Sequence, residues 1–344
     1  MAKILVIRFS AIGDVAMTVP VIHSWATQYP RHQIVFLSRP SLAPLFSNLP
    51  DNVSFFNADL KGRHSGWKGL YVLFKELKAL HFDAVLDLHN VLRTKYLSLL
   101  FRFIGTPVYV LHKGRWGKRK LIRRRNKKLV SQKNSFQRYA DVFTKAGFPV
   151  LLNFSSIYGH EKGDFSIIQS VTGEKGNAKW IGIAPFAKHK GKIYPLELQE
   201  QVVAHFAQDD RVKVFLFGGG KEEEDCFKTW TDKYPTVTSL IGKLTMDTEL
   251  ALMSHLDVML SMDSANMHLA SLVNIPVVSI WGATHPYAGF MGWKQLPTNT
   301  IQITDLYCRP CSVFGQTPCY RGDYACLYGI MPVRVIEKIE SIVF

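Results

Sequence analysis

The hydrophobic positions of the chain fall into short apolar runs separated by longer stretches with helical spacing. The apolar runs are typical of strands buried on both faces of a parallel sheet. They occupy residues 3–9, 33–38, 53–57, 83–88, 107–111, 180–184, 212–217, 258–262 and 277–281. Stretches with helical spacing cover residues 67–80, 89–105, 134–146, 195–207, 246–254, 265–273 and 333–344. Repeated strand–helix units of this length predict an α/β protein with doubly wound sheets.

The length of 344 residues favours two domains over one core. Gly163, Gly173 and Gly176 interrupt any long element between residues 150 and 178. We therefore expect a first domain at residues 1–165 and a second at 166–330. No segment has the roughly 20 consecutive apolar residues of a membrane span, and the first residues do not resemble a cleaved leader. These features predict a cytoplasmic protein.

The net charge of +15 is concentrated in the first half of the chain. Residues 1–165 hold 26 Lys and Arg against 9 Asp and Glu, whereas residues 166–344 hold 16 against 18. The two halves therefore carry +17 and −2. This asymmetry indicates that the first domain meets an anionic partner such as nucleic acid, anionic lipid or a phosphorylated glycan.

One candidate site lies where the run at 258–262 ends and a helix begins. Asp263 and Ser264 follow the strand, and His268 lies about one turn further along on the face of Ser264. A helix that opens there leaves its first amides unpaired and its positive dipole end exposed, which favours phosphate. The simpler alternative is that the two polar residues only cap the helix and the imidazole packs nearby.

A second candidate site follows the first apolar run. Ser10 to Gly13 form a predicted turn, and Asp14 comes at the strand-to-helix junction on the carboxyl edge of the sheet. A helix cap and a catalytic carboxylate explain Asp14 equally well from spacing alone. A further polar group follows the run at 83–88 and either faces an acceptor or is a solvated helix start: Asp87, His89, Arg93 and Lys95.

Two segments resemble motifs of glycosyltransferase family 9, the lipopolysaccharide heptosyltransferases. They are IRFSAIGDVAMTVPVI at 7–22 and DSANMHLASLVNIPVVSIWG at 263–282, with Ala265 where the family usually has glycine. The resemblance extends over nearly the whole chain. It implies a GT-B type fold, in which two Rossmann-like domains face a central cleft. It also implies that the terminal helix, at 331–344, packs back on the first domain.

The resemblance implies an inverting transfer of heptose from ADP-heptose to the lipopolysaccharide inner core. Asp14 would be the general base, in a loop shaped by Ser10 and Gly13, and Lys192 would stabilise the departing diphosphate, with Lys188 as the alternative lysine. Glu222, preferred to Glu223, would contact the donor sugar or ribose. The remaining donor contacts would be Asp263, Ser264, Ala265 and His268. No Asp-x-Asp triplet occurs, so we expect neither a metal nor a cofactor.

Residues 113–128 are the densest charge run, with ten basic residues in sixteen. A solvated loop, a nucleic-acid contact and a contact with anionic lipid or a phosphorylated lipid-linked glycan are the three interpretations. No nucleic-acid module accompanies the run, and Trp116 suits a membrane interface, so we favour the third and expect no nucleic-acid partner. Lys113 and Arg115, with Arg93 and Lys95, would then contact the acceptor. The enzyme would be peripheral at the inner face of the inner membrane.

Four of the five cysteines fall within 19 residues: Cys308, Cys311, Cys319 and Cys326. Their spacing does not match the paired Cys-x-x-Cys pattern of a zinc ribbon, and a reducing compartment disfavours disulfides. We therefore favour unligated structural thiols over a zinc site. Two other functions stay open at this point: a family 9 transferase with a different nucleotide sugar or glycan acceptor, and a basic nucleic-acid-binding protein.

Overall fold

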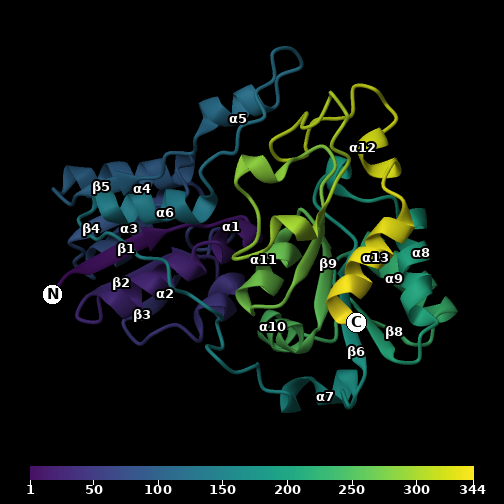
Figure 1. Cartoon of the computed structure of the whole chain (residues 1–344). Coiled ribbons are helices and arrows are strands. Elements are labelled where there is room, and N and C mark those ends of the chain that lie inside the picture. The colour runs from purple at the N-terminus through teal and green to yellow at the C-terminus, as the bar shows by residue number, and fades with distance from the viewer. The chain divides into compact units, whose positions relative to one another are not determined.

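A computed structural model describes residues 1–344, which divide into two compact units (Figure 1). The first unit comprises residues 1–113 and 134–157, and the second comprises 114–133 and 158–344. The boundary between the units lies a few residues before the expected position at residue 165. The division also differs from the expectation in a second way. Most of the basic run, although it lies within the first half of the sequence, belongs to the second unit.

The first unit is built on a five-stranded parallel sheet with the strand order β3-β2-β1-β4-β5. Its strands are β1 (Lys3–Ile7), β2 (Gln33–Ser38), β3 (Val53–Asn57), β4 (Ala84–Asp87) and β5 (Val108–Val110). Ile7 at the end of β1 pairs with Leu37 on one side and Asp87 on the other. Because parallel strands end at one edge of a sheet, the residues that follow β1 and β4 emerge side by side.

Five α-helices and a 3-10 helix complete the first unit. They are α1 (Ile12–Ala16), α2 (Val19–Gln28), α3 (Gly66–Lys78), α4 (Leu92–Phe103), α6 (Ser135–Lys145) and η1 (Pro40–Phe46). The helix expected after β1 is split into α1 and α2, because Pro20 lies in the first turn of α2 and has no N–H to continue the hydrogen bonding of α1. The inner faces of α3 and α4 pack on β1, β2 and β4.

The second unit contains a six-stranded parallel sheet with the order β11-β10-β9-β6-β7-β8. Its strands are β6 (Lys179–Ala184), β7 (Val212–Leu216), β8 (Val237–Ser239), β9 (Val258–Met262), β10 (Val277–Ile280) and β11 (Thr300–Ile301). The order reverses at β6 and β9, which are the central strands. In open α/β sheets such a reversal opens a crevice at the carboxyl ends of the strands.

The second unit has eight α-helices, and several of them pack on this sheet. They are α5 (Arg115–Leu121), α7 (Ser166–Thr172), α8 (Leu196–Ala207), α9 (Lys221–Lys233), α10 (Met246–His255), α11 (Ala265–Leu272), α12 (Ala325–Tyr328) and α13 (Pro332–Val343). Three 3-10 turns join them: η2 (Lys190–Lys192), η3 (Pro286–Ala288) and η4 (Pro297–Asn299). The pattern analysis did not predict α5, α7 and α12, because each is short and two of them lie in stretches rich in charge or glycine. No helix combines the length and the apolar character needed to cross a membrane.

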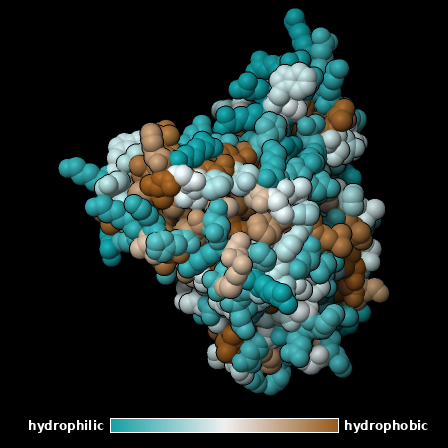
Figure 2. All heavy atoms as spheres, turned by 90° about the vertical axis from the view of Figure 1, so that its left-hand side faces the viewer, coloured by the Kyte–Doolittle hydropathy of each residue, from teal (hydrophilic) through white to brown (hydrophobic).

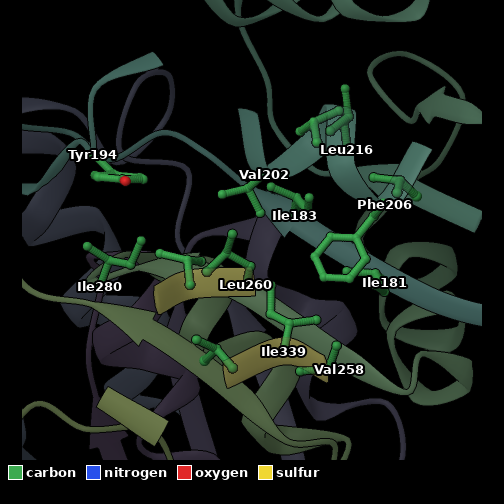
Figure 3. Packing of buried hydrophobic residues seen from close by; sticks show 14 of the residues in the cluster. Ile181, Ile183, Tyr194, Val202, Phe206, Leu216, Val258, Leu260, Ile280 and Ile339 are labelled. Carbon is green, nitrogen blue, oxygen red and sulfur yellow. The ribbon is translucent and has the colours of Figure 1, made fainter. Parts of the chain in front are cut away.

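The terminal helix α13 is part of the core of the second unit. Val335, Ile339 and Val343 are buried in the same cluster as Val258 of β9, and Figure 3 shows Ile339 beside Leu260 and Val258. Burial of each such side chain contributes about 1.5–3 kcal/mol. Within the second unit the apolar face of this helix is covered by α8 and β9.

Candidate functional site

The junction between β9 and α11 forms the centre of the candidate site in the second unit. Ser264 has an extended backbone (φ −139°, ψ −177°), so the helix begins at Ala265. Its side chain makes no hydrogen bond to the helix amides, and its Oγ lies 3.2 Å from Oγ of Ser261 instead. The capping explanation therefore does not hold for Ser264, and the first turn of α11 keeps the unpaired amides that an anion requires.

Lys192 reaches this junction from η2, the turn that follows β6. Its Nζ lies 2.8 Å from Oδ2 of Asp263 and 3.0 Å from the Asp263 carbonyl oxygen. The Asp263 side chain is 4% exposed and the Lys192 side chain 15%, so the pair is largely screened from solvent. A buried carboxylate needs such a partner. Lys188, in contrast, is exposed, so the structure brings Lys192, and not the alternative lysine, to the start of α11.

Two glycines allow close packing around Lys192. A Cβ atom added to Gly315 would lie 2.7 Å from Cγ of Lys192, and one added to Gly191 would lie 2.9 Å from Cβ of Ala283. The Gly191 carbonyl accepts a hydrogen bond of 2.8 Å from the Ala283 amide. The cysteine-rich segment therefore packs against the lysine stem at Gly315, and the loop that follows β10 packs against the neighbouring backbone at Gly191, which restricts the conformations of Lys192.

Arg309 holds these loops together from inside the second unit. Its guanidinium donates to the carbonyl oxygens of Gly282 (2.6 Å), Trp281 (2.9 Å) and Thr284 (2.9 Å), and also to that of Ile303. Burial lowers the pKa of Arg309 to about 10, so the side chain stays charged at neutral pH. Sequence analysis missed this residue, because one arginine among cysteines carries no signal that separates it from a surface charge.

The glycine turn that opens α9 is closed by Glu223, the neighbour of the glutamate that we expect to contact the donor. Oε2 of Glu223 accepts a hydrogen bond of 2.7 Å from the Gly219 amide, and burial raises the pKa of Glu223. Gly220 has φ +111°, a conformation that side chains other than glycine rarely adopt. Glu222 is exposed on the first turn of the helix. The turn is therefore closed by Glu223, whereas Glu222 faces solvent.

His268 lies one turn after Ser264 on α11, as the spacing predicted, and its side chain is buried. Its carbonyl oxygen accepts a hydrogen bond of 2.7 Å from Oγ of Ser271. Ala265, the first residue of the helix, is partly exposed. A methyl group thus stands at the mouth of the helix, where a glycine would leave more room for a phosphate.

In the first unit, Asp14 is paired with an arginine that sequence analysis did not single out. Nη2 of Arg8 lies 2.9 Å from Oδ2 of Asp14, and the same oxygen accepts a bond of 3.3 Å from the Ala11 amide. Arg8 is buried and also donates to the carbonyl oxygen of Leu88, so it links β1 to the residue after β4. Asp14 thus both caps α1 and sits at the carboxyl edge of the sheet. An arginine directly after the buried run at 3–7 was the available signal.

Tyr139 of α6 contacts both members of this ion pair. Its hydroxyl donates to the carbonyl oxygen of Asp14 at 3.3 Å, and its ring lies 5.5 Å from Cζ of Arg8. Burial raises the pKa of the Tyr139 phenol, so the side chain stays neutral. No local pattern marks this tyrosine, which comes 125 residues after Asp14.

His89 and Asp87 order the neighbouring turn after β4. Oδ1 of Asp87 accepts bonds from the amides of His89 (2.9 Å) and Asn90 (2.7 Å), and burial raises the pKa of Asp87. Burial, together with the charge of Arg8, lowers the pKa of His89 to about 3, so the imidazole is neutral at pH 7. Its Nδ1 accepts a hydrogen bond of 3.4 Å from the Phe9 amide, which leaves the proton on Nε2, 3.4 Å from Oγ of Ser10.

The other expected acceptor residues separate into two groups. Gly13 is buried in α1 beside Asp14, and Lys113 lies near enough to His89 for its charge to lower the pKa of the imidazole. Arg93 and Lys95 are exposed on the first turn of α4, and Arg115 is exposed on α5 in the second unit. Ser10, Gly13, Asp14 and Lys113 therefore lie near the carboxyl edge of the first sheet. The other three expected acceptor residues, all cationic, lie on helix surfaces.

The basic run is a packed part of the second unit and not a wholly solvated loop. Lys118 is buried with its Nζ 3.9 Å from the centre of the Phe290 ring. Nζ of Lys127 donates to the carbonyl oxygens of Cys308 (2.7 Å) and Pro310 (2.9 Å). The basic side chains that stay exposed are Arg115, Arg119, Arg123, Arg124, Arg125 and Lys128.

The cysteines occur as free thiols. Cys326 is buried in the core of the second unit, and burial raises its pKa to about 12. The structure contains no group of three or more His, Cys, Asp or Glu side chains placed to hold a metal ion.

Comparison with known proteins places this arrangement in a family. The lipopolysaccharide core heptosyltransferase OpsX of Haemophilus influenzae is 24% identical over 83% of this chain and 80% of its own. A family 9 glycosyltransferase from Veillonella parvula has the same fold, with a TM-score of 0.75, 19% identity and coverage of 99% and 97% of the two chains. The Escherichia coli heptosyltransferase WaaC, solved with ADP-2-deoxy-2-fluoro heptose, has a TM-score of 0.67 at 16% identity, covering 98% and 99%. The family model of glycosyltransferase family 9 (heptosyltransferase) matches residues 70–317, so the chain belongs to this family of glycosyltransferases.

Proposed function

We propose that this glycosyltransferase transfers heptose from ADP-heptose to the inner core of lipopolysaccharide. The observation that carries the proposal is the ammonium group of Lys192, 2.8 Å from Asp263, at the open start of α11. A cation and unpaired helix amides at the carboxyl edge of a parallel sheet suit a diphosphate. The E. coli relative solved with ADP-2-deoxy-2-fluoro heptose supports a heptose donor linked to ADP.

The donor diphosphate would face Lys192 and the first turn of α11. A lysine ammonium has three N–H donors, and Nζ of Lys192 donates one hydrogen bond to the carbonyl oxygen of Asp263 and forms an ion pair with its carboxylate. The N–H groups that remain would bind the diphosphate and stabilise the charge that develops as ADP departs. Ser264, Ala265 and His268 would line the same pocket.

Asp14 would act as the general base in a single displacement. The acceptor hydroxyl attacks the anomeric carbon of heptose and gives its proton to the Asp14 carboxylate. The bond from the anomeric carbon to the phosphate oxygen breaks, and ADP leaves with the electron pair. One displacement inverts the anomeric configuration. Arg8 and the Ala11 amide would hold the carboxylate in the orientation that this step requires.

The acceptor would be a phosphorylated glycan linked to lipid, which brings the enzyme to the anionic inner face of the inner membrane. The exposed arginines of the basic run, from Arg119 to Arg125, support this partner, because each basic residue near an anionic surface contributes about 1 kcal/mol. Ser10, Gly13 and Lys113, gathered beside Asp14, are the acceptor contacts that we propose.

Two measurements test the proposal. Calorimetric titration should give tighter binding of ADP than of UDP or GDP. The variant Asp14→Asn should lower turnover of ADP-heptose about 10²–10⁴-fold without weakening the binding of ADP. Asp51→Asn, which changes an exposed carboxylate at the opposite edge of the first sheet, is the control. Equal affinity for the three nucleotides would exclude the ADP-linked donor, and normal turnover of Asp14→Asn would remove that residue from the mechanism.

A further inference from the structure

The outward face of α4 carries large apolar side chains that no part of the chain covers. Leu92, Leu99 and Phe103 are 69%, 49% and 77% exposed. They are seven and four residues apart, so they form one stripe along the helix. The opposite face of α4 buries Leu97 and Phe101 in the core of the first unit. The exposed stripe is therefore additional to the face that the fold needs.

The neighbouring helix α3 extends this stripe. Trp67 and Tyr71, one turn apart, are 53% and 44% exposed. The Trp67 ring packs edge-on against Tyr96 of α4, with 5.1 Å between the ring centres. We call Trp67, Tyr71, Leu92, Leu99 and Phe103 the α3–α4 stripe. Figure 2, which looks onto the side where the first unit lies in Figure 1, shows hydrophobic side chains gathered on the surface among hydrophilic ones.

Basic side chains surround the α3–α4 stripe. The two helices hold six Lys and Arg and a single acidic residue, Glu76. The carboxylate of Glu76 already bonds to His64 and pairs with Arg63. The cations are exposed, and Nζ of Lys75 lies 5.0 Å from the Tyr71 ring. They are Lys68, Lys75, Lys78, Arg93, Lys95 and Arg102.

The combination selects one class of partner. Aliphatic and aromatic groups rimmed by lysine and arginine are typical of helices that lie in the headgroup region of an anionic bilayer. A second copy of the chain would bring two surfaces of the same positive charge together, which is unfavourable. Nucleic acid would leave Leu92, Leu99 and Phe103 without a matching apolar surface.

We propose that the α3–α4 stripe docks the first unit on an anionic membrane. Leu99 and Phe103 enter the boundary between headgroups and acyl chains, and Lys68 and Lys75 contact lipid phosphates. This surface is distinct from the basic run at 113–128, of which all but Lys113 belongs to the second unit. The inference rests on the proposed function in one respect, since a lipid-linked acceptor is what brings the enzyme to the membrane.

Vesicle sedimentation tests the proposal with two independent variants. With vesicles of phosphatidylglycerol and phosphatidylcholine, Leu99→Gln/Phe103→Gln should lower the partition coefficient about 100-fold, because two apolar side chains no longer insert. Lys68→Gln/Lys75→Gln should lower it about 25-fold, about fivefold per charge, and weaken its salt dependence. The second variant changes only exposed lysines, so it keeps the test decisive if the first does not fold.

Matched controls come from exposed positions of the second unit. Val333→Gln on α13 and Lys228→Gln on α9 replace an exposed apolar residue and an exposed lysine, and both should bind vesicles like the wild type. All four variants should keep the wild-type affinity for ADP and the turnover of a lipid-free acceptor. If the proposed function is wrong, the wild-type protein itself should not bind ADP.

Two results would overturn the docking proposal. One is vesicle binding of both test variants at the wild-type level. The other is a lipid-free dimer in analytical ultracentrifugation that Leu99→Gln/Phe103→Gln converts to a monomer, which would assign the stripe to a second copy of the chain.

Discussion

Replacing Gly315 by alanine should displace Lys192 without changing the identity of any residue that we assign to the donor. The added Cβ would lie 2.7 Å from Cγ of Lys192, 3.2 Å from Cδ and 3.1 Å from Cε. Carbon atoms in contact are usually about 3.5–4.0 Å apart, so the lysine stem must move by about 1 Å. The clash begins at Cγ, near the backbone, and we expect the resulting movement of the side chain to carry Nζ away from Asp263.

The expected magnitudes follow from this displacement. Gly315 has φ +81°, where an alanine costs about 1–2 kcal/mol of folding free energy. Weakening the largely buried Lys192–Asp263 pair adds about 3 kcal/mol. If Lys192 stabilises the departing diphosphate, loss of this contact should lower turnover about 10²–10³-fold.

Gly322 provides a matched control in the same segment. It also has φ +81°, but a Cβ added there meets no atom within 4 Å. Gly322→Ala should therefore lower the free energy of unfolding by the backbone term alone and keep turnover within a few-fold of the wild type. The assays are urea unfolding and the initial rate of ADP release from ADP-heptose. Equal turnover of Gly315→Ala and Gly322→Ala would refute the role given to Lys192 and its confinement by Gly315.

Two further predictions concern the first unit. Arg8→Met removes the cation beside Asp14 and should lower the free energy of unfolding by about 2 kcal/mol in urea. This is less than the 3–5 kcal/mol of a fully buried pair, since the Asp14 side chain is 33% exposed, and an unchanged stability would show that solvent screens the pair. The pKa of His89 is lowered to about 3, so its neutral form is favoured in the folded state. The stability that it contributes is complete above pH 6.5 and is lost as the pH falls toward 3. His89→Gln should therefore have a flatter pH dependence of unfolding than the wild type, and parallel curves for the two proteins would contradict this account.

The strands, the main helices and the two strand-to-helix junctions could be predicted from the sequence, because each depends on neighbouring residues. A run such as 258–262 is apolar at every position, and Asp263 and Ser264 mark its end before the spacing changes to that of a helix. The family was predicted at the same junctions, and the match over residues 70–317 confirmed it. The short helix α5 was not predicted, because its charged residues have no apolar periodicity.

The tertiary structure alone decided which of several similar side chains meet. Lys188 and Lys192 have the same chemistry and lie in one loop, yet only Lys192 points to Asp263, 71 residues further along the chain. Packing also decided that Glu223 closes the glycine turn, that Arg8 and Tyr139 hold Asp14, and that α13 belongs to the second unit. Local sequence patterns predict the secondary structure of a segment. Pairings between distant side chains depend on the register of distant strands and on the space between packed loops, and a short stretch of sequence does not determine either.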